Sequence, residues 1–462
     1  MKRAPAIAAF VGLAVSASAS ALNLNPTGTG QVLLYPYYTV NANQDTYFSV
    51  ANQDSVPKVI KVRFLEGRNG RPALDVDVVL KAHDAWTAAI SVDAGGGAKL
   101  VTFDDSCTRP AIPAGGIAFT SSGYDGSSTI PADDGPHDIA RTREGSVEVI
   151  GGANILSPDS TPFSVDCNTV FADLATPAVA LAAPGRLFGW AAVIDVGAGH
   201  YYSYNATAID KFTEVALYSD DWGPLKPTLN DANSAEDDSH RPVAYFFLQG
   251  NTSSDSILGV PQRGEYEKGV DAVSAVLIAD TIENDYIVDA GLGASTDWVV
   301  TMPTLHLYVD PIYPDANDRA AYRWLGCCSA FAYDRSGTQQ GGRIDFQLPY
   351  STTVVSFQRS GGPASGVFGS TLDVNVMPAA DTGTMRIEMP FDHSQPGAGD
   401  TYTGLSYDNG ALYGSPVIGF MAYNIVNANA QPGQLGNYGA VADHRRTTCG
   451  TSAFINSFIC TY

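Results

Sequence analysis

Basic residues are scarce in this chain of 462 residues. Lys and Arg together number 26 against 48 Asp and Glu residues, and the formal net charge at pH 7 is −22. A negative charge of this size repels nucleic acids and anionic membrane surfaces, so we expect neither as a partner. Charged residues of both signs make up only 16% of the chain, whereas soluble proteins typically contain about 25%.

Long apolar runs are also missing. The first apolar run, Ala6–Val15, has ten residues, which is about half the length that a membrane-spanning helix needs. We therefore expect no transmembrane segment. Lys2 and Arg3 precede this run, and small Ser and Ala residues follow it up to Ala21, as in a secretory signal peptide. We expect residues 1–21 to be that peptide and the mature chain to be exported to the periplasm, the cell surface or the medium.

Short catalytic motifs are absent as well. The chain has no Gly-x-Ser-x-Gly elbow and no His-x-His or His-Glu-x-x-His spacing, so neither an α/β-hydrolase nucleophile nor a zinc-hydrolase site is indicated. No glycine-rich loop has the spacing that cradles a phosphate. The sequence does not single out an acid or a nucleophile among its candidate glutamates, Glu66, Glu144, Glu148, Glu214 and Glu388.

Cysteine is rare but even in number, with six residues at Cys107, Cys167, Cys327, Cys328, Cys449 and Cys460. Exported proteins form disulfides, and these six residues are the candidates. We expect one disulfide between Cys107 and Cys167, closing a long polar stretch, and another between Cys449 and Cys460, stapling a terminal hairpin. The adjacent Cys327 and Cys328 can form a vicinal disulfide, stay reduced and buried, or pair elsewhere. A metal site is the weakest interpretation, since no Cys-x-x-Cys pair is present.

What the chain does contain favours β-structure. Gly and Pro number 46 and 27, and the 23 Tyr residues outnumber the 19 Phe residues. Such a composition is typical of secreted β-proteins. One segment alternates strictly, with Leu74 and Val76 on one face and Asp75 between them on the other, as in a half-buried strand. Similar segments recur along the chain, so we expect an all-β fold of antiparallel β-sandwich-like regions with one or two short helices.

The length of the chain predicts two domains. We expect an N-terminal β-sandwich-like domain at 22–219 and a C-terminal β-rich domain at 243–462, joined by a polar linker at 220–242. Within the first domain, the Ser-, Gly-, Pro- and Asp-rich segment 104–144 is expected to be a long exposed excursion.

Three shorter segments carry predictions of their own. The apolar stripe near 270–286 predicts a helix. Residues 305–309, with the sequence LHLYV, are expected to form a strand, and residues 206–212 one or two helical turns.

Oxygen-bearing side chains cluster in one Pro-containing segment, at Asp310, Asp315, Asn317 and Asp318. Calcium takes about six to eight oxygen ligands, so this cluster is a candidate calcium site. The EF-hand pattern is absent, and a solvated turn explains the same residues. No other cofactor is indicated. A second, weaker acidic cluster lies at Asp231 and 236–238.

Tyrosines recur on two predicted strands and are candidates for stacking on sugar rings. They are Tyr35, Tyr37, Tyr38, Tyr201, Tyr202 and Tyr204. Aromatic residues in strands also pack against core neighbours, and the sequence leaves both roles open.

Several long segments resemble a group of uncharacterised secreted proteins of Gram-negative bacteria. They include Gly28–Asn52, Lys58–Ile90 and Ser295–Asp310, together with the stretches VIGFMAYNIVN and NYGAVADHR. The resemblance implies one integrated secreted architecture. It implies no activity, and it carries over no catalytic residue.

Export, β-structure, Tyr-rich strands and the lack of catalytic motifs together favour a binding protein. We expect a secreted or cell-envelope β-protein that acts by binding or assembly, without catalysis, on envelope or matrix components. The alternative is a secreted hydrolase of polysaccharide, with carboxylates or a Ser-His-Asp triad brought together from distant segments.

Overall fold

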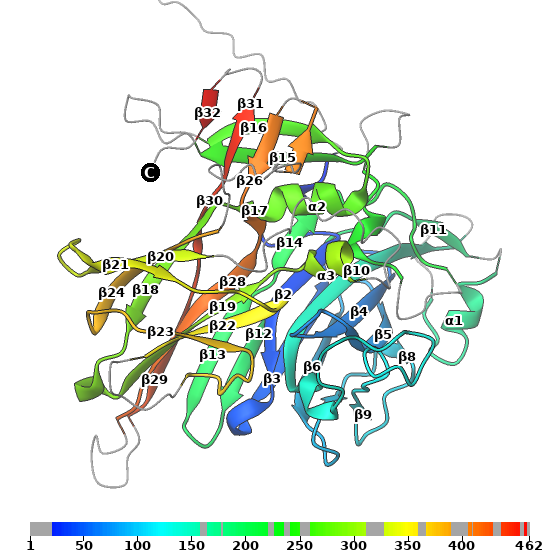
Figure 1. Ribbon diagram of the computed structural model, residues 1–462. Helices are drawn as coiled ribbons and strands as arrows, with labels where there is room; N and C mark the ends of the chain where they lie inside the picture. The colour runs from blue at the N-terminus through cyan, green and yellow to red at the C-terminus, as the bar shows by residue number, and fades with distance from the viewer. Residues whose placement is uncertain are drawn as a thin grey trace, which may run out of the picture.

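The computed structural model of this protein describes most of the chain. The described residues are 21–157, 164–176, 179–219, 226–234, 241–249, 259–310, 328–358, 366–389, 405–408, 410–427, 436–452 and 457–459. Antiparallel sheets dominate this part of the chain, which contains three short α-helices (Figure 1). The all-β prediction is therefore confirmed.

Two sheets from the first half of the chain pack face to face as a sandwich. The eight-stranded sheet has the order β1 (Asn23–Leu24), β14 (Thr207–Asp210), β2 (Val32–Thr39), β10 (Glu144–Leu156), β4 (Lys58–Glu66), β5 (Pro72–Leu80), β8 (Cys107–Arg109), with β11 (Ala180–Ala182) paired to β10. The six-stranded sheet has the order β13 (His200–Asn205), β12 (Leu187–Asp195), β3 (Asp45–Asn52), β6 (Ala85–Val92), β7 (Ala98–Val101), β9 (Ile117–Ala118). Their inner faces share one aromatic-rich core, where Phe48 meets Tyr35 and Phe64 edge-on.

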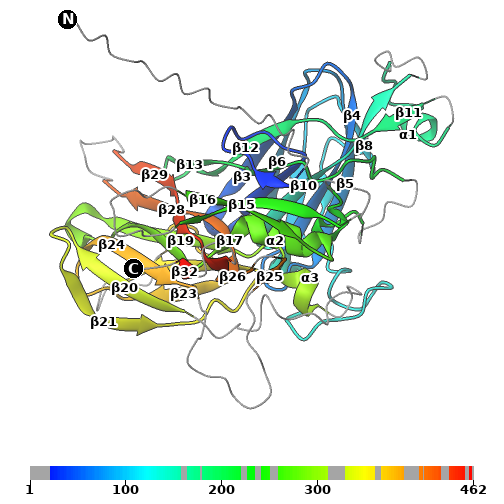
Figure 2. The same cartoon turned by 90° about the horizontal axis from the view of Figure 1, so that it is seen from above.

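The second half of the chain adds two five-stranded sheets. The first has the order β21 (Gln339–Asp345), β20 (Ser329–Asp334), β24 (Thr382–Glu388), β18 (Thr281–Ile287), β30 (Arg445–Thr447). The second has the order β23 (Asp373–Val376), β22 (Thr352–Phe357), β19 (Ala294–Thr301), β28 (Ile418–Ile425), β29 (Tyr438–Asp443). Figures 1 and 2 both place β20, β21 and β24 on the opposite side of the molecule from β4, β5 and β8.

Smaller pieces complete the second half. The strands are β25 (Leu405–Tyr407), β26 (Gly410–Tyr413), β31 (Cys449–Ser452) and β32 (Ser457–Ile459) in one sheet, and the pairs β15 (Val243–Gln249) with β16 (Gly259–Glu265) and β17 (Ile278–Ala279) with β27 (Ser415–Pro416). The 3-10 turns are η1 (Asn41–Asn43), η2 (Ile139–Arg143), η3 (Leu229–Asp231) and η4 (Ala290–Leu292). No helix in the described part of the chain has the length and apolar character that crossing a membrane requires.

The helices differ from the predictions in three places. Helix α2 (Gly269–Leu277) confirms the first half of the 270–286 prediction, but the second half forms β17 and β18, because pairing with β24 outweighs the local helical pattern. The expected strand at 305–309 is helix α3 (Leu305–Val309): a short apolar run does not distinguish a helix from a strand. The expected helical turns near 206–212 are mostly strand β14, paired with β2. Helix α1 (Val170–Asp173) was not predicted.

The hydrophobic cores draw on both halves of the sequence. Tyr204 of β13 stacks on Phe420 of β28, with ring centroids 4.5 Å apart. Ile209 and Leu34 from the first half pack in one cluster with α2 from the second half. Residues on either side of the 220–242 segment therefore share continuous packing.

Candidate functional site

A ladder of opposite charges crosses the outer face of the eight-stranded sheet. Glu148 on β10, Arg63 on β4 and Asp75 on β5 lie side by side in register, and the Arg63 guanidinium donates to Glu148 at 3.0 Å and to Asp75 at 3.3 Å. In the next row, Lys61 donates to Asp77 at 2.9 Å. Asp77 also accepts from Arg109 of β8 at 3.0 Å. Cross-strand pairs of this kind stabilise a sheet when their signs alternate.

These charges are buried, although they lie on the outward side of the sandwich. Arg63 is 0% and Glu148 2% exposed. Burial raises the pKa of Glu148 to about 7 and that of Asp75 to about 6, partly offset in both cases by the Arg63 guanidinium. One guanidinium thus serves two carboxylates in a low-dielectric setting, and the carboxylates hold their protons more tightly than in water.

Helix α3 covers this ladder. Its residue His306 is buried, and its pKa is lowered to about 3 by burial and then by the charge of Arg63. At the end of α3, Asp310 forms a buried ion pair with Arg71. Arg71 also donates to the carbonyls of Gly123 at 3.0 Å and Pro131 at 2.9 Å. Arg71 therefore ties the 104–144 segment to α3.

The predicted calcium ligands can now be placed in part. Asp310 accepts from Arg71, while Asp315, Asn317 and Asp318 lie outside the described residues. Among the residues that the structure describes, no group of three or more His, Cys, Asp and Glu side chains is arranged to hold a metal ion. From the second acidic cluster, Asp231 completes a capping box with Thr228, and 236–238 lie outside the described residues.

Two other candidate glutamates hold segments of chain together. The Glu144 carboxylate accepts hydrogen bonds from Tyr37, Ser370 and Thr371 at 2.6–2.9 Å, which joins the two halves of the chain. The Glu66 carboxylate accepts three backbone N–H groups and the guanidinium of Arg141. Both carboxylates are buried and saturated, so neither is presented to a substrate.

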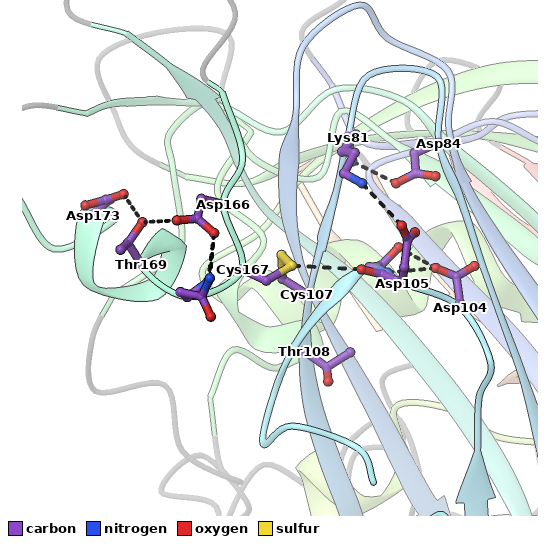
Figure 3. Close-up of a disulfide and its surroundings, with 12 residues drawn as sticks. Lys81, Asp84, Asp104, Asp105, Cys107, Thr108, Asp166, Cys167, Thr169 and Asp173 are labelled. Atoms are coloured by element: carbon purple, nitrogen blue, oxygen red, sulfur yellow. Dashed lines mark hydrogen bonds and ion pairs between the residues drawn. A yellow bond between two sulfur atoms is a disulfide. The ribbon is translucent and has the colours of Figure 1, made fainter. Parts of the chain in front are cut away.

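The 104–144 segment runs mostly over the surface but has buried anchors. Phe119 is 3% and Tyr124 0% exposed, and Arg141 lies over the Tyr124 ring with 4.3 Å to its centroid. At its start, Cys107 forms the predicted disulfide with Cys167 (Figure 3). Helix α1 follows Cys167, and its Phe171 packs against Arg109 at the end of the charged ladder. The disulfide therefore holds α1 against the Arg109 end of the charged ladder.

The remaining cysteines are described only in part. Cys328 and Cys449 are also disulfide-bonded, and Cys327 and Cys460 lie outside the described residues.

The outer face of the six-stranded sheet has the opposite character. Phe188 and Trp190 on β12, Tyr47 on β3 and Tyr201 on β13 are 42%, 39%, 46% and 52% exposed. Phe188 and Trp190 are two residues apart, so both side chains stand on the same side of β12. Tyr47 lies opposite Ala192 on β12, two residues beyond Trp190. Tyr201 lies opposite Ile194, two residues further. We call these four side chains the aromatic face.

Small and uncharged residues separate the four rings. Thr87, Ser203 and Asn205 are exposed beside them, while Ala192 is 0% exposed. On the outward positions of β3, β6, β12 and β13, the only charged residue is Asp45, at the start of β3. Lys99 of β7 lies on the same face of the sheet, and the Asp104 carboxylate accepts the N–H of Thr87. A chain of net charge −22 therefore presents few charges here.

The sheet beneath the aromatic face is tightly held. Gly189, between Phe188 and Trp190, leaves room for the Tyr35 hydroxyl, which crosses the core and donates to the Ser49 carbonyl at 2.7 Å. A side chain at position 189 would overlap that hydroxyl. Because the strands are locked from inside, the rings stand on a rigid support.

The structure divides the six candidate tyrosines. Tyr201 is exposed, whereas Tyr35, Tyr37, Tyr38, Tyr202 and Tyr204 are buried in the sandwich core. Sequence reasoning missed Phe188, Trp190 and Tyr47. The period of two along β12 was the available signal, since inward Leu187, Ala191 and Val193 imply that Phe188 and Trp190 point outward.

Comparisons with known proteins find no match to this chain among family models, curated proteins or solved structures. The resemblance to secreted proteins of Gram-negative bacteria therefore stays a prediction from the sequence, and a function has to be inferred from the surface itself.

Proposed function

We propose that this protein is an exported, non-catalytic binding protein, and that its aromatic face binds an uncharged polysaccharide chain of the envelope or matrix. The observation that carries the proposal is the set of four exposed rings on one rigid sheet face. Large aromatic side chains exposed together on a soluble protein mark interaction surfaces.

The shape of the face supports a chain ligand. Phe188 and Ile194 lie six residues apart on one strand, which corresponds to about 20 Å. This length accommodates several sugar rings in a row, whose C–H faces can stack on Phe188, Trp190, Tyr47 and Tyr201. The exposed Thr87, Ser203 and Asn205 can exchange hydrogen bonds with sugar hydroxyls.

The charge of the face supports a neutral ligand. An anionic polysaccharide would meet a protein with nearly twice as many acidic as basic residues, and on the outer face of the six-stranded sheet it would meet the carboxylate of Asp45 and only one cation, Lys99 of β7. A neutral glycan has no such penalty. A protein partner, including a second copy of the chain, would also bury the rings, and the experiment separates that outcome.

The test is affinity electrophoresis through gels that contain neutral polysaccharides such as glucans, mannans and galactans, or anionic ones such as alginate. We expect retardation by at least one neutral polysaccharide, and a loss of about tenfold or more in affinity in the Phe188→Ala/Trp190→Ala variant. Phe247→Ala is the matched control, since Phe247 is 62% exposed on a different sheet.

Three outcomes would contradict the proposal. They are no retardation by any neutral polysaccharide, unchanged retardation of the double variant, and concentration-dependent dimers that dissociate in that variant. Release of reducing ends during incubation with the polysaccharide would instead support the hydrolase alternative.

A further inference from the structure

A pocket of about 430 Å³ opens between the two sheets of the second half. It is lined by the end of β18, the start of β24, the turn between β20 and β21, and the middle of β28. Tyr286 and Met421 are its buried residues, and Asp285, Arg335 and Thr384 are exposed at its rim. The pocket belongs to different sheets from the aromatic face, so it constitutes a separate candidate site.

Tyr286 lines this pocket and has a buried hydroxyl. Its side chain is 2% exposed, and its ring stacks on Phe357 with centroids 5.2 Å apart and planes within 13°. The hydroxyl is buried and has no hydrogen-bond partner among the described residues. Buried polar groups in native proteins nearly always have a partner. Burial, with the nearby Asp334 and Asp381, raises the pKa of Tyr286, so the hydroxyl keeps its proton and can donate as well as accept.

Two tyrosine side chains from the neighbouring sheet lie near this pocket. Tyr423 of β28 is half-buried and lines the pocket. Its cross-strand partner on β29 is Ala440, and Tyr438, two residues away on β29, is 64% exposed. Tyr423 and Tyr438 are therefore diagonal neighbours on one sheet face, within reach of the same ligand. A hydroxyl next to aromatic rings suits a sugar, because a sugar ring has hydroxyls at its edge and C–H groups on its face.

The charges around the pocket argue against an anionic ligand. The Asp334 carboxylate accepts hydrogen bonds from Ser336, Thr338 and Gln340 within its turn, and these lower its pKa. Asp334 is therefore ionised and fixed in place. Asp285 adds a second carboxylate at the rim, against the single guanidinium of Arg335.

We propose that this pocket binds one sugar residue without negative charge, which hydrogen-bonds to the Tyr286 hydroxyl and stacks on Tyr423. The site is independent of the polysaccharide surface proposed above. It would suit a chain end or a free monosaccharide, because its volume is that of a small ligand and not of a long groove.

The test uses the full mature chain and methyl glycosides of glucose, galactose and mannose, with methyl glucuronide as the anionic probe. Binding is followed by saturation-transfer NMR and quantified by titration. We expect at least one neutral glycoside to bind more tightly than the glucuronide. Tyr286→Phe, which retains the ring and its stacking on Phe357, should lower that affinity about five- to tenfold.

Tyr266→Phe is the matched control. The Tyr266 hydroxyl is also buried without a hydrogen-bond partner among the described residues, but it does not line the pocket. The Phe188→Ala/Trp190→Ala variant should still bind the monosaccharide, which separates this proposal from the first. The inference is overturned if no neutral glycoside binds, if the glucuronide binds as tightly, or if Tyr286→Phe binds like the native chain.

Discussion

The two sheets of the first sandwich turn outer faces of opposite character toward their surroundings. The eight-stranded sheet carries Arg63, Glu148 and Lys61 outward, yet these charges are at most 3% exposed. The six-stranded sheet carries Phe188 and Trp190 outward, yet these rings are 42% and 39% exposed. Soluble proteins usually bury apolar and expose charged side chains, so both faces reverse the expectation.

The two reversals have different explanations within the fold. The charged face is covered by α3, by α1 and by chain from the second half, and each charge there has an ionic partner. It is an internal interface of the protein. The aromatic face has no cover among the described residues, and its rings are left available. The charged face therefore holds parts of the fold together, and the aromatic face is the surface that we propose for binding.

Stability should depend most strongly on Arg63, at the centre of the charged ladder. Arg63→Met removes the guanidinium shared by Glu148 and Asp75 and leaves two buried carboxylates without it. We expect a loss of about 3–5 kcal/mol in the free energy of unfolding, measured with denaturant. Arg343→Ala, which breaks a solvent-exposed pair with Asp345, should lower the free energy of unfolding far less, because water screens that pair. Equal losses in the two variants would contradict the structural role of the ladder.

The disulfide should have the next largest effect. Cys107→Ser/Cys167→Ser opens a loop with a sequence separation of 60 residues and frees α1 from the ladder's end. The expected cost is about 2–4 kcal/mol in the free energy of unfolding. Polysaccharide binding should stay native at temperatures where the variant is folded, since the aromatic face lies on the other sheet. If the free energy of unfolding of this double variant equalled that of the native chain, α1 would not stabilise the charged ladder.

A smaller effect concerns pH. The pKa of Glu148 is raised to about 7, so the folded state binds its proton more tightly than the unfolded state. Protonated Glu148 therefore contributes to the free energy of unfolding. This contribution is fully present below the pKa of an unfolded glutamate and is lost as the pH rises toward 7. Glu148→Gln should therefore flatten the fall in stability between about pH 5 and 7.

That comparison needs thermal or denaturant unfolding of both proteins at several pH values. The exposed Glu283→Gln on β18 controls for the loss of a carboxylate. His306 and His444, whose pKa values burial lowers to about 3 and 4, act in the opposite sense, and they act equally in all three proteins. Identical slopes for native chain and Glu148→Gln would contradict the assigned environment.

The smallest effect on stability is expected on the aromatic face. Trp190→Ala removes a ring that is 39% exposed, so it leaves little cavity, and we expect a change within about 1 kcal/mol. Trp298→Ala, at a fully buried tryptophan, should cost about 3–5 kcal/mol. If Trp190→Ala were as costly as Trp298→Ala, the aromatic face would be a structural surface like the charged one.

The sequence predicts these two faces unequally. Strict alternation placed Leu74 and Asp75 on opposite faces of β5, and the structure agrees. The ladder itself was out of reach, because Glu148 and Arg63 are 85 residues apart and meet only through the sheet order. The disulfide between Cys107 and Cys167 was predicted from the polar stretch that it closes.

Exposure was the hardest property to predict. Tyr201 and Tyr202 are neighbours in one strand, but only Tyr201 points outward.

Leu305 and Ile282 were assigned to the wrong kind of element, since short apolar segments fit either periodicity. The pocket at Tyr286 joins four separate segments of the chain between Asp285 and Tyr423, and no local pattern indicates it.

Hydroxyl-radical footprinting, with and without the polysaccharide that retards the protein in the gel, shows whether the aromatic face is the binding surface. We expect oxidation of Phe188, Trp190, Tyr47 and Tyr201 to fall several-fold when the polysaccharide binds. Phe247, which is 62% exposed on the separate strand pair β15 and β16, should be oxidised at an unchanged rate. Protection of Phe247 in place of the four rings, or uniform protection of all five, would contradict the proposal.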